Sequence, residues 1–446
     1  MMPKKTGKAL TELRERTLNY LEQIARKSEL QAFNSVESLG KLLERINELE
    51  KKPKEKHGKL FGLCFSIKDV FAVQGLPFQC SSKSLDGYIA PYSAKVVEQI
   101  LKEDGIILGK TNCDEFACGS SGENSAFQTS QNPKFKGKTC GGSSSGTACS
   151  VSAELCDIGL GSDTGGSIRL PATFCNIQSF KPTHDIISRH GLSDLAMSLD
   201  TVAWMEKTVQ YSETLLNLFC EQKEKLKEKK EITQIGIIRE QMENLDTKVE
   251  QKIKKTIQTL ERKGLEVIEH SMPLQKIAVP AYYACMYAEF SSSMQKFDGF
   301  KYGKQFSGSD IIEAVKVNRS VLGKEVKRRI LLGTYLTQKE ESQKFYKKAL
   351  TARARLQKEY TQLFQKTPIL ISSVAPVPPF GLGEKIADPI QMYSADLLTV
   401  QANLIGSPAG SISLGEGIGL QVMGNQFEDK TVLGCLQKWE NWVNAP

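Results

Sequence analysis

Segments that predict helices and strands alternate along much of this chain. A helix is predicted over Ser93–Glu103, with the serine as its N-cap, and a short apolar strand follows at Ile106–Leu108. The same order returns with a strand at Ile235–Ile238, a helix at Lys248–Arg262 and a strand at Leu265–Ile268. This alternation predicts an α/β fold in which helices cover a mixed sheet.

The 446 residues divide into four regions by composition. These are two amphipathic helices with a charged connector in residues 1–59, a core in residues 60–215, a largely helical segment in residues 235–366, and a return to strands and loops in residues 367–446. Large α/β enzymes of this length often form one domain. We therefore expect a single domain over residues 1–446, with a sheet built from both ends of the chain.

The composition excludes several classes of protein. With 40% hydrophobic and 25% charged residues the chain is of the globular type, and no apolar run approaches the roughly 18 residues of a membrane span, so no membrane partner is expected. The net charge of +8 does not by itself indicate binding to nucleic acid. The eleven cysteines form no paired metal motif, and we expect reduced thiols and no metal site.

Two glycine- and serine-rich segments are the most unusual feature of the sequence. They are GGSSSG at Gly141–Gly146 and GSDTGGSIRLP at Gly161–Pro171, with a helix of small residues predicted between them. Glycine at this density permits close backbone approaches and leaves consecutive N–H groups free to point at one spot. Such segments also occur as linkers or phosphate cradles, although the lysine of a phosphate-binding loop is missing here. A catalytic role and a structural role both stay open at this point.

The supply of histidine limits the kind of nucleophile that the chain offers. The sequence has four histidines, none in a metal-ligand spacing or a nucleophile-elbow context: His57, His184, His190 and His270. A Ser-His-Asp triad therefore requires assembly from distant segments. A lysine activates a serine instead when burial leaves its amine neutral.

Lys68 is the candidate lysine for such a role. It lies in the strand-like run Leu63–Val70, where a lysine would face apolar neighbours. In the alternative interpretation, its ammonium group pairs with Asp69 or extends into solvent while the carbon chain covers apolar surface. The strand pattern alone leaves both interpretations open.

Taken together, Lys68 and the segments Gly141–Gly146 and Gly161–Pro171 resemble the amidase signature family, and the resemblance covers nearly the whole chain. It implies a single amidase domain with the α/β fold of that family, a mixed, twisted β-sheet sandwiched by helices. It also implies a Ser-Ser-Lys triad in which Ser167 is the nucleophile, Ser143 the bridging serine and Lys68 the base. The resemblance also implies a cis peptide bond at Ser143.

The resemblance further implies how the nucleophile works. Ser167 attacks the side-chain amide of glutamine, ammonia leaves, and water releases glutamate. The oxyanion hole is implied at four consecutive N–H groups, those of Thr164, Gly165, Gly166 and Ser167. The catalytic loops then lie in the core, within residues 60–215.

Within the family, the chain is most similar to the A subunits of glutamyl-tRNA(Gln) amidotransferases. The segments that carry this similarity are Gly109–Ser120, Phe297–Gly303, Gly323–Tyr335 and Asp388–Thr399. By position, Tyr282, Arg329 and Asp396 would hold the free glutamine. An arginine suits its α-carboxylate and an aspartate its α-ammonium group. For Arg329 alone, which follows two other basic residues, the alternative is a solvated helix face.

The resemblance also implies partners for this chain. A GatB-like, kinase-like subunit would activate the glutamate of Glu-tRNA(Gln) and receive the ammonia, and a small GatC-like or GatF-like subunit would clamp the pair. ATP and Mg²⁺ would belong to the GatB-like partner, so no cofactor and no metal is expected in this chain. Contact with the tRNA would be made through the complex.

Two other functions stay open on the sequence: a stand-alone amidase acting on another small amide, and an inactive scaffold subunit. The glutamine-binding residues argue against the first, and the intact triad argues against the second. The net positive charge and the GGSSSG form of the loop resemble organellar relatives. The mitochondrial matrix is therefore the expected location, with the bacterial cytoplasm as the alternative. Ser145, Asn176 and His184 depart from the residues usual in the family, which are glycine, glycine and tyrosine.

Overall fold

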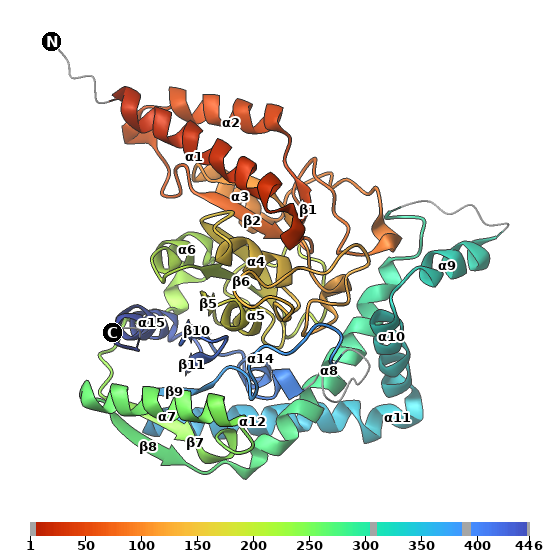
Figure 1. Cartoon of the computed structure of the whole chain (residues 1–446). Helices are drawn as coiled ribbons and strands as arrows, with labels where there is room; N and C mark the ends of the chain where they lie inside the picture. Colours follow the sequence, from red (N-terminus) through yellow and green to blue (C-terminus); the bar gives the residue numbers. More distant parts are fainter. Residues whose placement is uncertain (1–5, 304–309, 386–393, 444–446) are drawn as a thin grey trace.

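The computed structural model describes residues 6–303, 310–385 and 394–443, which form one mixed sheet of eleven strands between layers of helices (Figure 1). The strand order is β1-β3-β2-β4-β6-β5-β10-β11-β9-β7-β8. The strands are β1 (Phe33–Val36), β2 (Cys64–Lys68), β3 (Ile106–Thr111), β4 (Ile158–Asp163), β5 (Gln178–Lys181), β6 (Thr201–Glu206), β7 (Gln234–Ile238), β8 (Glu266–His270), β9 (Ile369–Ser373), β10 (Ala409–Ser413) and β11 (Gly419–Gly424). The predicted α/β sandwich is confirmed.

Strand direction changes across the sheet. β3, β2 and β4 are parallel near one end, and β9, β7 and β8 are parallel at the other. The pairs between β4 and β9 are antiparallel, and β1 is antiparallel to β3. Because β5 pairs with β10, strands from both ends of the chain share one sheet.

The central strand β6 shows why helices lie on both faces of the sheet. Val202 and Trp204 pack into one hydrophobic core, while Ala203 and Met205 pack into another. Successive side chains of a strand point to opposite faces, and every residue of β6 is buried. Helices must therefore pack on both faces at the centre of the sheet.

Two layers of helices supply that cover (Figure 1). One face carries α4 (Ser145–Ser152) and α5 (Arg169–Phe174), and the other carries α3 (Lys95–Lys102), α6 (Ser212–Phe219), α7 (Thr247–Arg262) and α15 (Asp429–Val443). Every residue of α4 is buried. The helix lies so close to β4 that a Cβ on Gly159 would overlap Thr147, which explains its small side chains.

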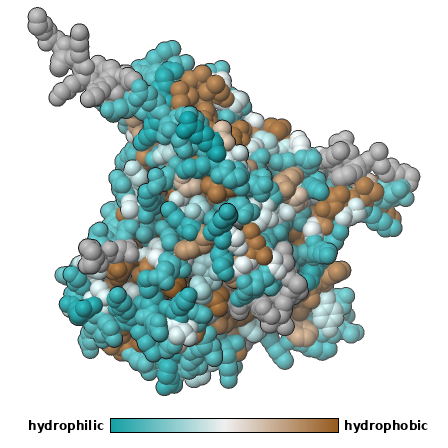
Figure 2. All heavy atoms as spheres, in the orientation of Figure 1, coloured by the Kyte–Doolittle hydropathy of each residue, from teal (hydrophilic) through white to brown (hydrophobic). Residues whose placement is uncertain are grey.

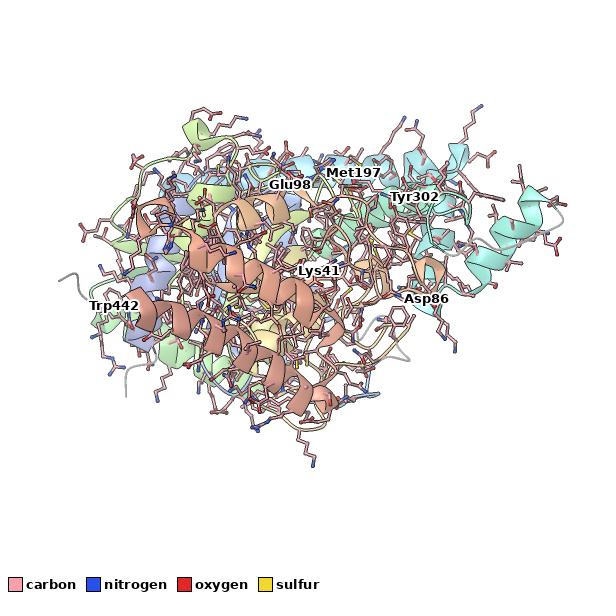
Figure 3. All side chains as sticks on the ribbon, turned by 90° about the horizontal axis from the view of Figure 1, so that it is seen from above. Lys41, Asp86, Glu98, Met197, Tyr302 and Trp442 are labelled. Carbon is pink, nitrogen blue, oxygen red and sulfur yellow. The ribbon has the colours of Figure 1, made fainter. Side chains whose placement is uncertain are left out.

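Two further helices cover the β1 end of the sheet. α1 (Thr6–Arg26) and α2 (Leu39–Lys51) lie side by side, and Figure 3 looks down on them, with Lys41 of α2 labelled. The sequence predicts both helices but not β1 between them. This strand has four residues and none of them is fully buried, so it leaves little pattern in the sequence.

A largely helical segment follows β8, as the sequence predicts. They are α8 (Ala278–Ser293), α9 (Ile311–Ser320), α10 (Lys324–Thr337), α11 (Lys339–Lys344) and α12 (Tyr346–Lys366). α8 packs against α10 and α12, whereas α9 lies at the edge of the molecule in Figure 1. Hydrophilic residues cover most of the face seen in Figure 2, and none of the described helices has the length and apolar character of a membrane span.

The predicted ends of the helix at Ser93–Glu103 are wrong in detail. Ala94 occupies the N-cap position of α3, because the Ser93 hydroxyl accepts a hydrogen bond from the Gln74 N–H instead (3.0 Å). After the helix, Asp104 rather than Gly105 takes the left-handed conformation, with φ of 68°. Contacts with a neighbouring loop therefore override the local capping signal.

Candidate active site

Strand β2 ends at Lys68, between its parallel neighbours β3 and β4. The side chain is fully buried, and its Nζ donates hydrogen bonds to Ser143 Oγ (2.7 Å) and Ser162 Oγ (3.1 Å). The carboxylate of Asp69 pairs instead with Lys110, 3.0 Å away. The structure therefore places the Lys68 amine against Ser143, rather than against Asp69 or in solvent.

The surroundings of Lys68 favour a neutral amine. Burial lowers the pKa of Lys68 below its ordinary value, because a charge is costly away from water. Nearby acidic groups, among them Asp114 and Asp163, act in the opposite direction. Burial also raises the pKa of Asp114 and that of Asp200 to about 7, which weakens this opposition. A neutral amine is the form that accepts a proton from a serine.

Ser143 lies in the turn that leads into α4, and the peptide bond between Gly142 and Ser143 is cis, as the family resemblance implies. The Asp114 N–H donates to the Ser143 carbonyl oxygen (3.1 Å). The Asp114 carboxylate accepts from the N–H groups of Gly122 (3.0 Å) and Asn124 (2.8 Å). A Cβ on Gly142 would overlap this carboxylate, so only glycine fits before Ser143.

Ser167 lies in the loop between β4 and α5. The other residues from Gly161 to Leu170 are buried, whereas Ser167 is partly exposed. Among the described residues, the structure gives no hydrogen bond between Ser143 and Ser167. The geometry thus joins Lys68 directly to Ser143 and leaves Ser167 as the accessible serine of the predicted triad.

A buried ion pair holds the Ser167 loop in shape. Arg169 donates two hydrogen bonds to the Asp163 carboxylate, at 3.0 and 2.9 Å. Its other donors reach the Thr399 carbonyl (2.9 Å), the Gln421 side chain (2.6 Å) and the Asn403 side chain (2.7 Å). All five guanidinium N–H groups are therefore used. Burial alone would raise the pKa of Asp163, but the pairing with Arg169 holds it well below its usual range.

The backbone of the same loop is the predicted oxyanion hole. The Gly166 N–H donates to Asp163 Oδ1 (3.0 Å), so this group already has an acceptor. The remaining candidate donors are the N–H groups of Thr164, Gly165 and Ser167. Gly166 has φ of 126°, a conformation that residues with a Cβ rarely adopt. The glycines thus let the loop turn tightly between Asp163 and Ser167.

The three predicted glutamine-binding residues come together beside this loop. The Tyr282 hydroxyl lies against Gly165, where a Cβ would overlap it. Burial raises the pKa of Tyr282 well above its ordinary value; Asp396 raises it further, and Arg329 acts in the opposite direction. Arg329 is almost fully buried, so its interpretation as a solvated helix face is wrong.

Asp396 and Arg329 are each oriented by neighbouring side chains. Asp396 Oδ2 accepts hydrogen bonds from the Ser120 hydroxyl (2.6 Å) and the Tyr283 hydroxyl (2.9 Å), while burial raises its pKa to about 6. Arg329 Nε donates to Glu325 Oε1 (2.7 Å), one helical turn away on α10. An acidic and a basic group in one buried neighbourhood suit the zwitterionic end of an amino acid.

Sequence reasoning missed the residues that orient this site. They are Asp114, Ser120, Asp163, Arg169 and Tyr283. Asp163 and Arg169 could have been noticed in the sequence, because an acidic residue and an arginine lie six residues apart within the segment Gly161–Pro171. Ser120 and Tyr283 left none, since their contacts with Asp396 join distant parts of the chain.

The thiols and the acidic groups give no sign of a metal centre in the part of the chain that the structure describes. There, no three His, Cys, Asp or Glu side chains are placed to share a metal ion. The eleven cysteines are buried free thiols. Burial raises the pKa of Cys113 to about 12, although the nearby Lys68 lowers it, so this thiol is protonated and unreactive.

Comparison with known sequences identifies relatives over nearly the whole chain. A family model described as Amidase matches residues 15–433. The A subunit of the glutamyl-tRNA(Gln) amidotransferase of Methanocaldococcus jannaschii is 40% identical over 441 residues, which cover 96% of this chain and 98% of that protein. The protein of the same name from Thermoanaerobacter pseudethanolicus is 37% identical, covering 97% and 98%. These archaeal and bacterial relatives give no support to a mitochondrial location.

Solved structures match over the same length. The crystal structure of the A subunit of the glutamyl-tRNA(Gln) amidotransferase from Thermotoga maritima has a TM-score of 0.78 and 30% identity, over 96% of this chain and 92% of that chain. A crystal structure of an amidase has a TM-score of 0.83 at 24% identity, over 98% of both chains, which shows the shared fold. The chain therefore belongs to the amidase family and is homologous over nearly its whole length to the A subunits of glutamyl-tRNA(Gln) amidotransferases.

Proposed function

We propose that this chain is the glutaminase subunit of a glutamyl-tRNA(Gln) amidotransferase. In this function it hydrolyses glutamine and supplies the ammonia that converts Glu-tRNA(Gln) to Gln-tRNA(Gln). The observation that carries the proposal is the buried Lys68 amine, hydrogen-bonded to Ser143 in a core that exposes Ser167. Similarity to A subunits over nearly the full length supports the same function.

The reaction follows from these three side chains. The neutral Lys68 amine takes a proton from Ser143, which takes one from Ser167 as its oxygen attacks the side-chain carbonyl carbon of glutamine. N–H groups of the Ser167 loop stabilise the negative charge that develops on the carbonyl oxygen. The C–N bond breaks, the proton returns to the nitrogen, and ammonia leaves a glutamyl ester on Ser167. Water then attacks the ester, gives up a proton to the same relay, and releases glutamate.

The neighbouring side chains explain the choice of glutamine. Arg329 would pair with the α-carboxylate and Asp396 with the α-ammonium group, while Tyr282 closes the pocket against Gly165. A stand-alone amidase acting on another small amide is the second candidate, but its substrate would not need the charges of Arg329 and Asp396. An inactive scaffold subunit would not need a lysine amine buried beside Ser143.

The ammonia requires an acceptor outside this chain. A GatB-like subunit would use ATP and Mg²⁺ to activate the glutamate of Glu-tRNA(Gln), and a GatC-like or GatF-like subunit would clamp the two together. This chain would need no cofactor of its own. Since the compared relatives come from archaea and bacteria, we favour the cytoplasm of a prokaryote over the mitochondrial matrix.

The test is amidation of Glu-tRNA(Gln) by the reconstituted complex, with glutamine or ammonium as the nitrogen donor. Ser167→Ala is expected to lose glutamine-dependent activity and to keep ammonium-dependent activity, because ammonium bypasses the triad. Ser145→Ala is the matched control, since the buried Ser145 hydroxyl has no hydrogen-bond partner among the described residues. If the wild-type complex uses neither donor, the stand-alone amidase takes precedence.

A further inference from the structure

The segment from Asp114 to Ser120 touches two parts of the candidate active site. The Asp114 N–H donates to the Ser143 carbonyl oxygen (3.1 Å), and the Ser120 hydroxyl donates to Asp396 Oδ2 (2.6 Å). Glu115 lies between these contacts along the chain and is only 1% exposed. A buried carboxyl group is costly unless it is hydrogen-bonded, so the partners of Glu115 indicate what it does.

The carboxyl group of Glu115 joins two distant segments. Oε1 accepts a hydrogen bond from the Ser82 hydroxyl (2.5 Å), and Oε2 accepts one from the Gly323 N–H (2.7 Å). Gly323 is the N-cap residue of α10 and has no side chain with which to cap the helix. An acidic group at this end also suits the helix dipole. Glu115 therefore anchors the start of α10 from outside the helix.

The anchor explains the glycine at the start of α10. A Cβ on Gly323 would lie 2.4 Å from Glu115 Oε2, and apart from the neighbouring residues of the chain only atoms of Glu115 lie within 4 Å of that position. The φ of Gly323 is −65°, which any residue adopts. The contact with Glu115, rather than the backbone conformation, therefore requires glycine here.

The backbone that follows Glu115 has an uncommon conformation. Phe116 and Ala117 have φ of 49° and 60°, in the left-handed region that residues with a Cβ rarely adopt. Such a conformation persists only where the surrounding contacts impose it, and here the Phe116 N–H donates to the Cys80 carbonyl oxygen (2.9 Å). The bend lets Glu115 face α10 while Ser120 faces the predicted glutamine-binding residues.

α10 carries Arg329, the residue predicted to bind the α-carboxylate of glutamine. Arg329 Nε donates to Glu325 Oε1 (2.7 Å), and Glu325 lies in the first turn of the helix, directly after the anchored Gly323. Arg329 also lies close to Cys118: burial raises the pKa of this thiol, and the charge of Arg329 lowers it. A movement of the first turn of α10 would therefore displace Glu325 and, with it, Arg329.

We propose that Glu115 is a positioning residue for Arg329 and thereby sets the preference of the site for an amide that carries an α-carboxylate. This inference rests on the proposed function, in which Arg329 binds glutamine. Glu115 itself touches no substrate. It holds the start of α10 in place, so its loss weakens binding of the α-carboxylate while the contact between Lys68 and Ser143 stays intact.

The first test is glutamine hydrolysis by the reconstituted complex, with 4-aminobutanamide as a competitor. This compound keeps the amine and the side-chain amide of glutamine but lacks the α-carboxylate. Glu115→Met should raise the KM for glutamine about tenfold and change kcat by less than about twofold. The inhibition constant of 4-aminobutanamide should also change by less than about twofold. Glu115→Gln keeps an acceptor for the Gly323 N–H, so its KM should stay within about threefold of the wild type.

A second variant disturbs the same contact from the side of α10. Gly323→Ala removes no buried group, and its Cβ would displace the Glu115 carboxyl group, so it should also raise the KM for glutamine about tenfold. Gly40→Ala on α2 is the matched control, because a Cβ there meets nothing within 4 Å. Glu98→Met is the control for Glu115→Met, since Glu98 is exposed on α3 (Figure 3). Both controls should keep the KM of the wild type.

Hydrogen–deuterium exchange tests the anchor without a substrate. In the full chain, the backbone of residues 323–329 should exchange faster in Glu115→Met than in the wild type or in Glu98→Met. Unchanged exchange in this segment, or equal losses of affinity for glutamine and 4-aminobutanamide, would overturn the proposal. A wild-type complex that hydrolyses no glutamine would instead refute the proposed function, and the exchange result would still decide whether Glu115 anchors α10.

Discussion

Lys68 carries its fully buried amine at the end of a strand, and its protonation state decides whether it acts as a base. Its pKa lies below the ordinary value of 10.5, so the neutral fraction, and with it kcat/KM for glutamine, rises with pH and levels off below pH 10.5. Lys68→Arg stays charged at every accessible pH and should lower kcat/KM by about 10²-fold or more. Glutaminase rates of both proteins across pH test this.

Ammonium-dependent amidation by the same complexes is the control, because it does not use the relay. A kcat/KM that is independent of pH in the wild type, or an active Lys68→Arg enzyme, would show that Lys68 is not the base. Lys68→Met would separate loss of the base from the effect of a permanent charge, since its side chain is neutral and of similar length.

Asn176 shows how a residue that departs from the family pattern still fits. Its φ is 55°, in the left-handed region that asparagine tolerates better than most residues, and its Oδ1 accepts a hydrogen bond from the Gly417 N–H (2.8 Å). We expect Asn176→Gly to lower the free energy of unfolding by about 1 kcal/mol, through the lost bond. Asn176→Val should cost about 2–3 kcal/mol, because a β-branched residue is strained there as well. Urea denaturation measures both, and equal effects would contradict the strain argument.

At the scale of elements, the turn from β4 into α5 depends on the ion pair of Asp163 and Arg169. Arg169→Met removes the partner of a fully buried carboxylate and should lower the free energy of unfolding by roughly 3–5 kcal/mol. The double variant Asp163→Asn, Arg169→Met should be less destabilised than Arg169→Met alone, since no buried charge is left over. Chemical denaturation of the wild type, of both single variants and of the double variant decides this, and additive losses would argue against the pairing.

Elements with a clear period could be predicted from the sequence, and those held by distant contacts could not. α7 and its flanking strands β7 and β8 lie within two residues of their predicted ends, because an apolar period and a glycine stop mark them. β1 was missed, since only its pairing with β3 defines it. The sequence predicts a cap at Ser93, yet its hydroxyl accepts a hydrogen bond from a loop that the sequence does not place nearby.

The same division holds for the candidate site. The strand around Lys68 and the glycine loops are local patterns, so the lysine and both serines could be named from the sequence with the help of the family resemblance. What Lys68 touches depends on the parallel pairing of β2 with β4, which brings Ser162 to its amine, and on the turn before α4, which brings Ser143. The sequence around Lys68 does not indicate these long-range contacts.

At the scale of the whole molecule, the first two helices cover one end of the sheet. Leu42, Ile46 and Leu49 of α2 are buried in the same core as Ile106 and Leu108 of β3. Deletion of residues 1–59 would expose this core, so we expect the truncated chain to lose cooperative unfolding or to precipitate. Thermal denaturation followed by circular dichroism is the measurement, and an unchanged melting temperature would contradict this role for α1 and α2.

In the proposed function, the whole molecule presents a buried lysine, a bridging serine and a partly exposed serine to a pocket for glutamine, and the central step would be a glutamyl ester on Ser167. Acid quenching of the complex during turnover of isotope-labelled glutamine, followed by proteolysis and mass spectrometry, tests that step most directly. We predict a labelled glutamyl group on the peptide that contains Ser167, absent in Ser167→Ala and present in Ser145→Ala. A glutamyl group on another residue, or undiminished glutamine hydrolysis by Ser167→Ala, would contradict the mechanism.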